Sequence, residues 1–188
     1  MKFDMTHINQ MNWEEFQNII DSLIEKLTDY QTTHNFKFDA VVPMLRSGGI
    51  PATVIANRMQ IIPVIPLQVK YNYDHGGVDV IIPPTCPENV SKDSIKNILV
   101  TECNTYSGQS AKLSYNLLHN AFPTSDLHYA CITKVYGGPE TIEGYKSYHV
   151  GKWTNEAFKD DAPEEYRKGI TIYPWETPEF ELEDINNA

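Results

Sequence analysis

The sequence predicts an α/β fold, with a Rossmann-like central parallel sheet, helices on both faces and a small C-terminal hood region. Strand-like and helix-like segments alternate along the chain, which is typical of a parallel sheet covered on both faces. Twice, an apolar strand runs into a short turn that opens a helix. The 188 residues are enough to bury a full core without disulfides or a metal, so we expect a single domain over 1–188.

The longest expected elements form a leading helix and two strand-turn-helix units. Apolar residues recur every three or four positions from Trp13 to Tyr30, which predicts an amphipathic helix. The first unit has a strand at Phe38 to Met44 and a helical pattern from Ile50 to Met59. The second unit has a strand at Ile95 to Thr101 and a helix from about Ala111 to Asn120.

The other segments are shorter or more polar. The β-branched run from Ile61 to Val69 predicts a strand. Residues 70–94 are rich in Gly, Pro, Tyr and Asp and predict a flexible loop that contains a short strand at 78–82. Further strands are expected at 127–135 and at 148–150.

We place the core of the domain at about 36–150 and the hood at about 136–176. Within the hood, a polar and charged stretch at 151–168 precedes an apolar one at 169–173. The tail at 177–188 is acidic, and we expect it to be loosely ordered.

Charge and cysteine content exclude several classes of partner. The 25 Asp and Glu against 15 Lys and Arg give a net charge of −10, which repels a phosphate backbone, so we expect no nucleic acid and no membrane as partner. No apolar run approaches the roughly 18 to 20 residues that span a bilayer. Cys86, Cys103 and Cys131 form no CxxC pair, and the N-terminus carries no secretory signal. We therefore expect a cytoplasmic protein without a metal site built from its own side chains.

The strongest local feature is the loop that follows the strand ending at Thr101. Ser107, Gly108 and Ser110 precede a helix, and a helix N-terminus presents free N–H groups and the positive end of its dipole. Gly108 permits close backbone approach, and the hydroxyls add hydrogen-bond donors for a phosphate. The alternative is an ordinary turn in which Ser and Thr only cap the helix.

The segment ILVTECNTYSGQS resembles the signature of type I phosphoribosyltransferases. That signature has an apolar strand, two adjacent acidic residues, a short loop, and then Thr or Ser, Gly, any residue and Thr or Ser. The resemblance implies that Glu102 binds the ribose hydroxyls of phosphoribosyl diphosphate (PRPP) and that Thr105 to Ser110 hold its 5-phosphate. It places these residues at the PRPP site: Glu102, Cys103, Asn104, Thr105, Tyr106, Ser107, Gly108, Gln109 and Ser110.

Two residues depart from the family's pattern. Cys103 stands at the second acidic position. Tyr106 stands where the family's purine enzymes often place an aspartate near the base. The usual group for proton transfer is therefore replaced.

A second match lies upstream, in VVPMLRSGGIPA. The family has a glycine-containing turn after its first sheet strand, which cradles the diphosphate. The resemblance implies that Gly48 and Gly49 let backbone amides face the diphosphate, and that Arg46 and Ser47 add donors, with Arg46 among the catalytic residues. Alone, RSGG more often marks a plain turn. Two such loops in order, about 60 residues apart and each between a strand and a helix, favour the binding interpretation.

The resemblance also implies residues for the base. CITKVYGGP places Lys134 where the family's purine enzymes have a lysine that reads the 6-oxo group, and GITIYPWE resembles the Pro-Trp-Glu ending of xanthine-guanine enzymes. Ile170 then falls at the position of the aromatic that stacks on the purine, so stacking would come from Trp153 or Tyr173. A lone lysine at a strand end is otherwise a solvated charge.

The segment KYNYDHGG stands where the family's flexible catalytic loop folds over PRPP. Its members Lys70, Tyr71, Tyr73 and His75 would shield the diphosphate from water. The alternative is a polar surface loop.

Taken together, these motifs predict a purine-type phosphoribosyltransferase that joins a nucleobase to PRPP and releases diphosphate. The expected cofactor is Mg²⁺, bridging diphosphate and ribose, with Glu102 contributing indirectly through ribose or water. The family is usually dimeric or tetrameric, so we expect a homodimer or homotetramer. The alternative is a non-catalytic PRPP- or nucleotide-binding regulatory module of the same fold, for which Cys103 and Tyr106 are the evidence.

Overall fold

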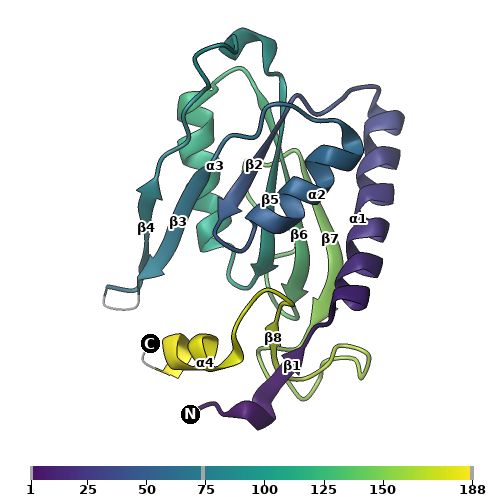
Figure 1. Ribbon diagram of the computed structural model, residues 1–188, viewed down its shortest axis with the longest axis vertical. Coiled ribbons are helices and arrows are strands. Elements are labelled where there is room, and N and C mark those ends of the chain that lie inside the picture. Colours follow the sequence, from purple (N-terminus) through teal and green to yellow (C-terminus); the bar gives the residue numbers. More distant parts are fainter. Residues whose placement is uncertain (1, 73–74, 187–188) are drawn as a thin grey trace.

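The computed structural model describes residues 2–72 and 75–186 and is built around a six-stranded sheet (Figure 1). The strands follow the order β4-β3-β2-β5-β6-β7, and all neighbours are parallel except β3 and β4. Their bounds are β2 Ala40–Leu45, β3 Leu67–Asn72, β4 Gly77–Ile82, β5 Asn97–Thr105, β6 Asp126–Val135 and β7 Ser147–Thr154. The predicted α/β fold class is confirmed.

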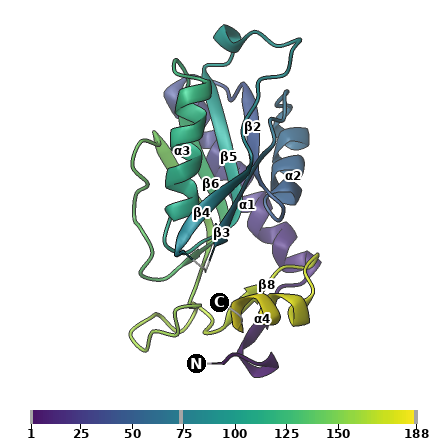
Figure 2. The same ribbon diagram turned by 90° about the vertical axis from the view of Figure 1, so that its left-hand side faces the viewer.

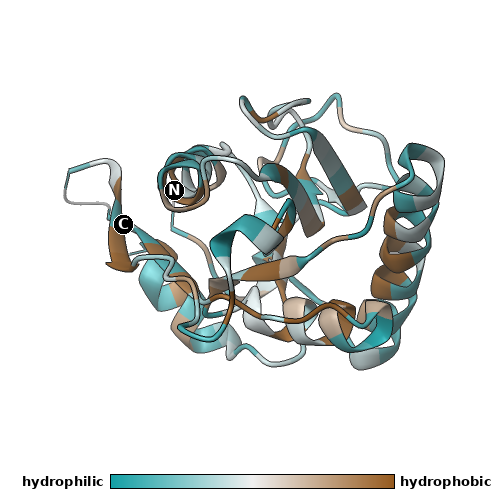
Figure 3. Cartoon of the chain, turned by 90° about the horizontal axis from the view of Figure 1, so that it is seen from above, coloured by the Kyte–Doolittle hydropathy of each residue, from teal (hydrophilic) through white to brown (hydrophobic). Residues whose placement is uncertain are grey.

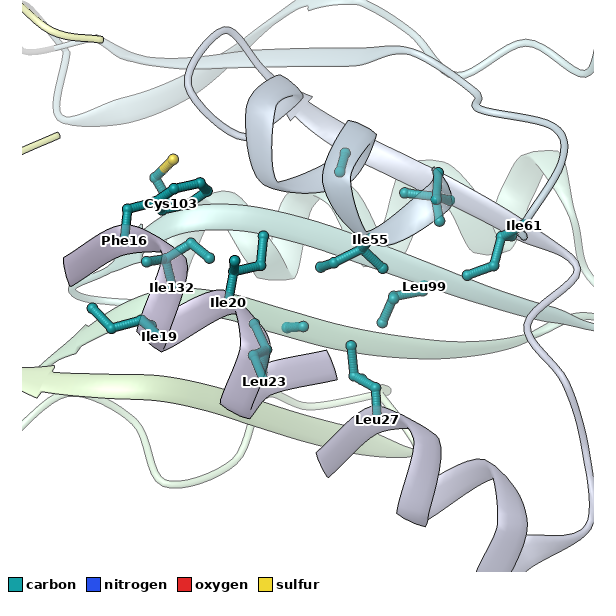
Figure 4. Packing of buried hydrophobic residues seen from close by; sticks show 14 of the residues in the cluster. Phe16, Ile19, Ile20, Leu23, Leu27, Ile55, Ile61, Leu99, Cys103 and Ile132 are labelled. Carbon is teal, nitrogen blue, oxygen red and sulfur yellow. The ribbon is translucent and has the colours of Figure 1, made fainter. Parts of the chain in front are cut away.

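Helices cover both faces of this sheet. α1 (Trp13–His34) and α2 (Gly49–Met59) lie on one face, and α3 (Gln109–Ala121) lies on the other (Figure 2). On the first face, apolar residues of α1 such as Leu23 pack with Ile55 of α2 and Leu99 of β5 (Figure 4). On the second, Leu118 of α3 packs over the sheet. The central strands are buried on both faces, which is why their sequences are almost continuously apolar.

A smaller unit lies beyond one end of the sheet and is made from both ends of the described chain (Figure 1). It contains a 3₁₀ turn at Met5–His7, strand β1 (Ile8–Gln10), its parallel partner β8 (Ile170–Ile172) and helix α4 (Pro178–Asn186). The backbone N–H of Phe3 donates to Asn186 Oδ1 at 2.7 Å. We call this unit the terminal layer.

The tail was expected to be loosely ordered, and this expectation is wrong for residues 178–186, which form α4. Leu182 of α4 is buried with Ile170 and Ile172, and Phe3 packs against the same cluster. The acidic composition suggested disorder, but this apolar face has a partner contributed by the other end of the chain.

Some boundaries differ from the expected ones. The run from Ile61 to Val69 was expected to be a strand, yet ladder pairing starts at Leu67, and only an isolated bridge joins Val64 to Val41 before it. Pro63 and Pro66 explain why the strand begins later than expected, since proline has no N–H to donate to a ladder hydrogen bond. Part of the expected loop at 70–94 is a hairpin of β3 and β4, and a 3₁₀ turn at Lys92–Ser94 follows.

The helices are amphipathic. Figure 3 shows hydrophilic and hydrophobic residues together on the helices. Among the residues that the structure describes, no helix is long and apolar enough to cross a membrane.

Candidate functional site

Two strand-to-helix loops meet at the carboxyl edge of the sheet. One joins β2 to α2, and the other joins β5 to α3. β2 and β5 are adjacent, with Pro43 beside Thr101, so the loops are neighbours. The hydroxyl of Thr101 donates to the backbone oxygen of Gly48 at 3.4 Å. In open parallel sheets ligands bind at this edge, where the loops diverge.

The loop before α3 has the geometry of an anion site. Gly108 adopts a φ of 76°, a left-handed conformation that glycine reaches without strain, and α3 starts at the next residue. The N–H of Gln109 lies 3.5 Å from the hydroxyl oxygen of Ser107. α3 is 13 residues long, so the N–H groups of its first turn have no carbonyl partner one turn earlier in the helix, and they lie at the positive end of a full helix dipole.

This loop lines a cavity of about 620 Å³, which we call the phosphate-loop cavity. Its wall combines the loop, two carboxyl groups and apolar residues of the terminal layer. The lining residues are Phe3, Tyr71, Glu102, Asn104, Thr105, Tyr106, Ser107, Gly108, Gln109, Ser110, Ala111, Glu156, Ile170 and Ile185. Residues from β3, β5, α3, β8 and α4 therefore share one cavity.

Glu102 enters this cavity from β5. Its carboxylate accepts a hydrogen bond from the hydroxyl of Tyr129 on β6. Burial raises the pKa of Glu102 to about 7, and the Tyr129 hydrogen bond opposes that rise. Glu102 therefore changes charge near neutral pH.

The next residue, Cys103, lies in the core with Phe16 of α1 and Tyr173. It is 4% exposed, and burial raises the pKa of its thiol well above the usual value. Residues 102 and 103 alternate across the strand, so Glu102 is directed to the cavity and Cys103 to the core. Tyr106 is 57% exposed at the cavity rim.

The loop before α2 is more constrained. The peptide bond between Leu45 and Arg46 is cis. The hydroxyl of Ser47 donates to Glu176 Oε1 at 2.6 Å, and Glu176 Oε2 accepts from the backbone N–H of Tyr173 at 3.0 Å. A Cβ on Gly48 would lie 2.5 Å from Met44 O and 2.8 Å from Thr101 O, so only glycine fits there.

A second cavity of about 590 Å³ opens beside this loop, and we call it the Arg46 cavity. Arg46 and Lys70 are its basic residues, and α4 contributes carboxylates. The lining residues are Arg46, Ser47, Lys70, Trp175, Glu176, Thr177, Phe180, Glu181, Glu183 and Asp184. Lys70 Nζ lies 3.8 Å from Asp184 Oδ1.

The four residues expected at the base separate in the structure. Ile170 lines the phosphate-loop cavity. Lys134 is 1% exposed, with its ammonium 4.0 Å from the Trp153 ring centroid and 3.4 Å from Glu140 Oε1. Trp153 also stacks on Tyr166. Tyr173 is buried and bonds Thr133 through its hydroxyl, so the base roles of Lys134, Trp153 and Tyr173 stay predictions.

The residues of the expected flexible loop that the structure describes also lie in different places. Tyr71 lines the phosphate-loop cavity and Lys70 the Arg46 cavity. His75 pairs with Asp79 at 3.1 Å within the hairpin. Tyr73 lies outside the described residues.

Sequence reasoning missed four residues of this cavity, which are Phe3, Ala111, Glu156 and Ile185. Glu156 is the one with a carboxyl group, and it lies two residues after β7 ends. Its carboxyl accepts from Asn104 Nδ2 at 2.8 Å and from the backbone N–H of Thr171 at 3.1 Å. Burial is the main reason that its pKa is raised. Nothing local in the polar stretch 151–168 distinguishes this glutamate from Glu164 and Glu165.

No protein-family model matches the sequence. The structure, however, is similar to solved structures. A purine phosphoribosyltransferase from Pyrococcus horikoshii is 18% identical in sequence, with a TM-score of 0.66. The match covers 91% of this chain and 95% of that chain. A xanthine-guanine-hypoxanthine phosphoribosyltransferase from Helicobacter pylori is 16% identical with a TM-score of 0.65, over 95% and 99% of the two chains.

A hypothetical protein from Neisseria gonorrhoeae with bound ppGpp is also similar. It is 17% identical with a TM-score of 0.65, over 98% of each chain. These similarities extend over whole chains, and at this identity they establish the fold alone. The chain therefore has the type I phosphoribosyltransferase fold that its two loop motifs indicated.

Proposed function

We propose that the protein is a phosphoribosyltransferase that transfers the phosphoribosyl group of PRPP to a nucleobase, with a purine as the expected base. The observation that carries the proposal is the phosphate-loop cavity. It combines a helix N-terminus with hydroxyls, a carboxyl group at Glu102 and an apolar wall from Ile170 and Ile185. These surfaces match the three parts of a nucleotide: phosphate, ribose and base.

In the proposed reaction a base nitrogen forms a bond to C1 of the ribose. The bond from C1 to the diphosphate oxygen breaks, its electron pair leaves with diphosphate, and the base nitrogen loses its proton to water. Ser107 to Ser110 would anchor the 5-phosphate, and Glu102 would accept hydrogen bonds from the ribose hydroxyls. Both contacts orient C1 toward the base.

Arg46 and Ser47 would bind the leaving diphosphate, whereas the N–H groups of Gly48 and Gly49 donate within the turn, to Met44 O and Arg46 O. Arg46 is exposed beside the loop, and its guanidinium offers several N–H donors to an anion. Lys70 lines the same cavity and adds a second positive charge. Charge that develops on the leaving group would be stabilised there.

The proposed cofactor is Mg²⁺ carried by the substrate. Within 2–72 and 75–186 no group of three or more His, Cys, Asp or Glu side chains is arranged to hold a metal ion. Mg²⁺ commonly binds through substrate phosphates and one or two carboxylates while keeping several waters, which fits a cavity with Glu102 beside a diphosphate loop. When bound, it would neutralise charge on the diphosphate.

Specific observations favour a second candidate, a nucleotide-binding regulatory module. Cys103 is buried away from the cavity, and Tyr106 presents a phenol where the family's purine enzymes often have a carboxylate. A protein of similar fold was solved with bound ppGpp. A module of this kind would bind PRPP or a nucleotide and release no diphosphate.

One experiment separates the two candidates. The protein is incubated with Mg²⁺, PRPP and each of guanine, xanthine, hypoxanthine, adenine, uracil and orotate, and diphosphate release is measured. Release with one base that is lost in Glu102→Ala supports the transferase. No release with any base, together with a PRPP-induced rise in melting temperature, rejects the transferase and supports the module.

A further inference from the structure

Glu156 is a carboxyl group in the phosphate-loop cavity that belongs to neither loop motif. We propose that it determines which nucleobase binds, by accepting hydrogen bonds from N–H groups on the edge of the base. This inference rests on the proposed function, since it assigns the base end of the same cavity.

Both hydrogen bonds of the Glu156 carboxyl group are ones that it accepts. Asn104 Nδ2 donates to Oε2 at 2.8 Å, and the backbone N–H of Thr171 donates to Oε1 at 3.1 Å. Asn104 belongs to β5 and Thr171 to β8, so the carboxyl group is held from two walls of the cavity. A carboxylate has about four acceptor positions, and two remain for a ligand.

The surroundings of Glu156 suit a base better than a phosphate. Phe3, Ile170 and Ile185 line the same cavity and offer apolar surface to a flat ring. A carboxylate repels phosphate, which would instead be held by the hydroxyls and N–H groups at Ser107 to Ser110. In this proposal the phosphate lies at Ser107 to Ser110 and the base lies beside Glu156.

The burial of Glu156 favours a ligand that donates hydrogen bonds to it. Burial raises the pKa of Glu156, and the nearby Glu176 adds to the rise, while its two hydrogen bonds oppose it. A partly buried carboxylate gains most from additional donors, because it has lost water as a partner. Two adjacent N–H donors would fill the two free acceptor positions.

The class of base follows from this requirement. Guanine presents a ring N–H next to an exocyclic amino group, which makes a paired donor edge. Hypoxanthine presents the ring N–H alone, and adenine presents a ring acceptor at that position. Glu156 therefore favours guanine over hypoxanthine, and hypoxanthine over adenine.

The test compares Glu156→Gln with the wild type in the presence of Mg²⁺ and PRPP. Glutamine keeps the size of the side chain and replaces one acceptor with a donor. The expected result is a fall of about 10- to 100-fold in kcat/KM for guanine, a smaller fall for hypoxanthine and an unchanged KM for PRPP. Glu164→Gln, an exposed glutamate of the same segment, is the matched control and should leave all values unchanged.

Two outcomes overturn the proposal. One is an unchanged ratio of guanine to hypoxanthine kcat/KM in Glu156→Gln. The other is an equal loss for both bases with a higher KM for PRPP, which would mean that Glu156 only ties Asn104 to Thr171. Urea unfolding of each variant verifies that it is folded.

A binding experiment keeps this inference separate from the proposed reaction. If the wild type turns over no base, the transferase proposal fails, and calorimetry with guanosine and inosine 5′-monophosphates then decides the role of Glu156. Tighter binding of the guanine nucleotide that is lost in Glu156→Gln supports the assignment. Equal binding of the two nucleotides, or no binding of either, rejects it.

Discussion

The two loops at the carboxyl edge of the sheet differ in how the rest of the protein contacts them. The loop at Thr105 to Ser110 borders a cavity whose charged wall residues, Glu102 and Glu156, each have a hydrogen-bond partner within the fold. The loop at Arg46 to Gly49 is bonded to Glu176 through Ser47 and shares its cavity with the carboxylates of α4. Both cavities contain acidic side chains: those of the first are bonded within the fold, whereas those of α4 in the second share their cavity with Arg46 and Lys70.

The difference shows two ways of using glycine and serine in similar motifs. Gly108 supplies a positive φ that starts α3, whereas Gly48 supplies space against the backbone of Met44 and Thr101. Ser110 lines its cavity, whereas Ser47 is bonded to a carboxylate. The first loop therefore presents its serine to a cavity, whereas the second is bonded into the fold through its serine.

The largest expected effect tests the packing of the second loop. Gly48→Ala should lower the free energy of unfolding by about 2 to 4 kcal/mol, because the new Cβ would lie 2.5 Å from Met44 O and 2.8 Å from Thr101 O, both rigid backbone atoms. Gly49→Ala is the matched control. Its Cβ would meet only the flexible end of Leu45 at 3.1 Å, so a change within about 1 kcal/mol is expected. Equal stability of the two variants in urea unfolding would contradict the difference in packing.

The next prediction compares Ser110 of the first loop with Ser47 of the second. Ser110→Ala should weaken PRPP binding by roughly 10- to 100-fold, the usual effect of a hydrogen bond to a charged group, and leave stability nearly unchanged. Ser47→Ala should instead lower the free energy of unfolding by about 1 to 2 kcal/mol, because Glu176 loses a donor. Calorimetric titration with PRPP and urea unfolding measure the two quantities. Loss of stability in Ser110→Ala would show that this serine serves the fold.

A pH dependence follows from Glu102. Because burial raises the pKa of its carboxyl group to about 7, the group is mostly neutral at pH 6 and mostly charged at pH 8. The charged form accepts ribose hydroxyls better, so PRPP affinity should rise about tenfold over this range. The PRPP affinity of Glu102→Gln should depend less on pH, and the dependence that remains in this control measures the contribution of the ligand's own titration.

The same shift has a consequence for stability. A carboxyl group whose pKa is raised by folding destabilises the folded state at every pH above its unfolded value, and the effect grows until pH passes about 7. Glu102→Gln should therefore raise the melting temperature at pH 8 and change it little at pH 4. A lower melting temperature at pH 8 would show that the charged carboxylate stabilises the fold.

The loops could be predicted from sequence because their chemistry is local. Arg46 to Gly49 and Ser107 to Ser110 each lie between a strand and a helix within a few residues. The core strands were predictable for a related reason, since burial on both faces requires continuous apolar runs. The fold class and the position of the cavity edge could therefore be predicted from local sequence.

The rest of the site depends on contacts between distant segments. Glu156 acquires its position from Asn104 and Thr171, and α4 is stabilised by Phe3 at the other end of the chain. Aromatic residues give no local signal either, because the core and a base pocket both favour them. Tyr173 was therefore expected at the base, and it is buried against Thr133.

The smallest expected effect concerns α4. Asp184 Oδ1 lies 3.8 Å from Lys70 Nζ, and Glu181 is one of the residues that line the Arg46 cavity. Burial, Glu176 and Asp184 raise the pKa of Glu181, whereas Arg46 and Lys70 lower it, so these charges act on one another. Carboxylates beside the diphosphate loop should weaken the binding of a further anion.

The double variant Glu181→Gln with Asp184→Asn should therefore bind PRPP about two- to fivefold more tightly at low salt, and the gain should shrink at high salt because exposed charges are screened. Glu179→Gln on the same helix is the control, since Glu179 is exposed and outside the Arg46 cavity. Weaker binding in the double variant would mean that the carboxylates of α4 help to hold the diphosphate through bound cations. The contrast between the two loops would then lie in how each holds its anion, through backbone and hydroxyl donors in one and through metal and carboxylates in the other.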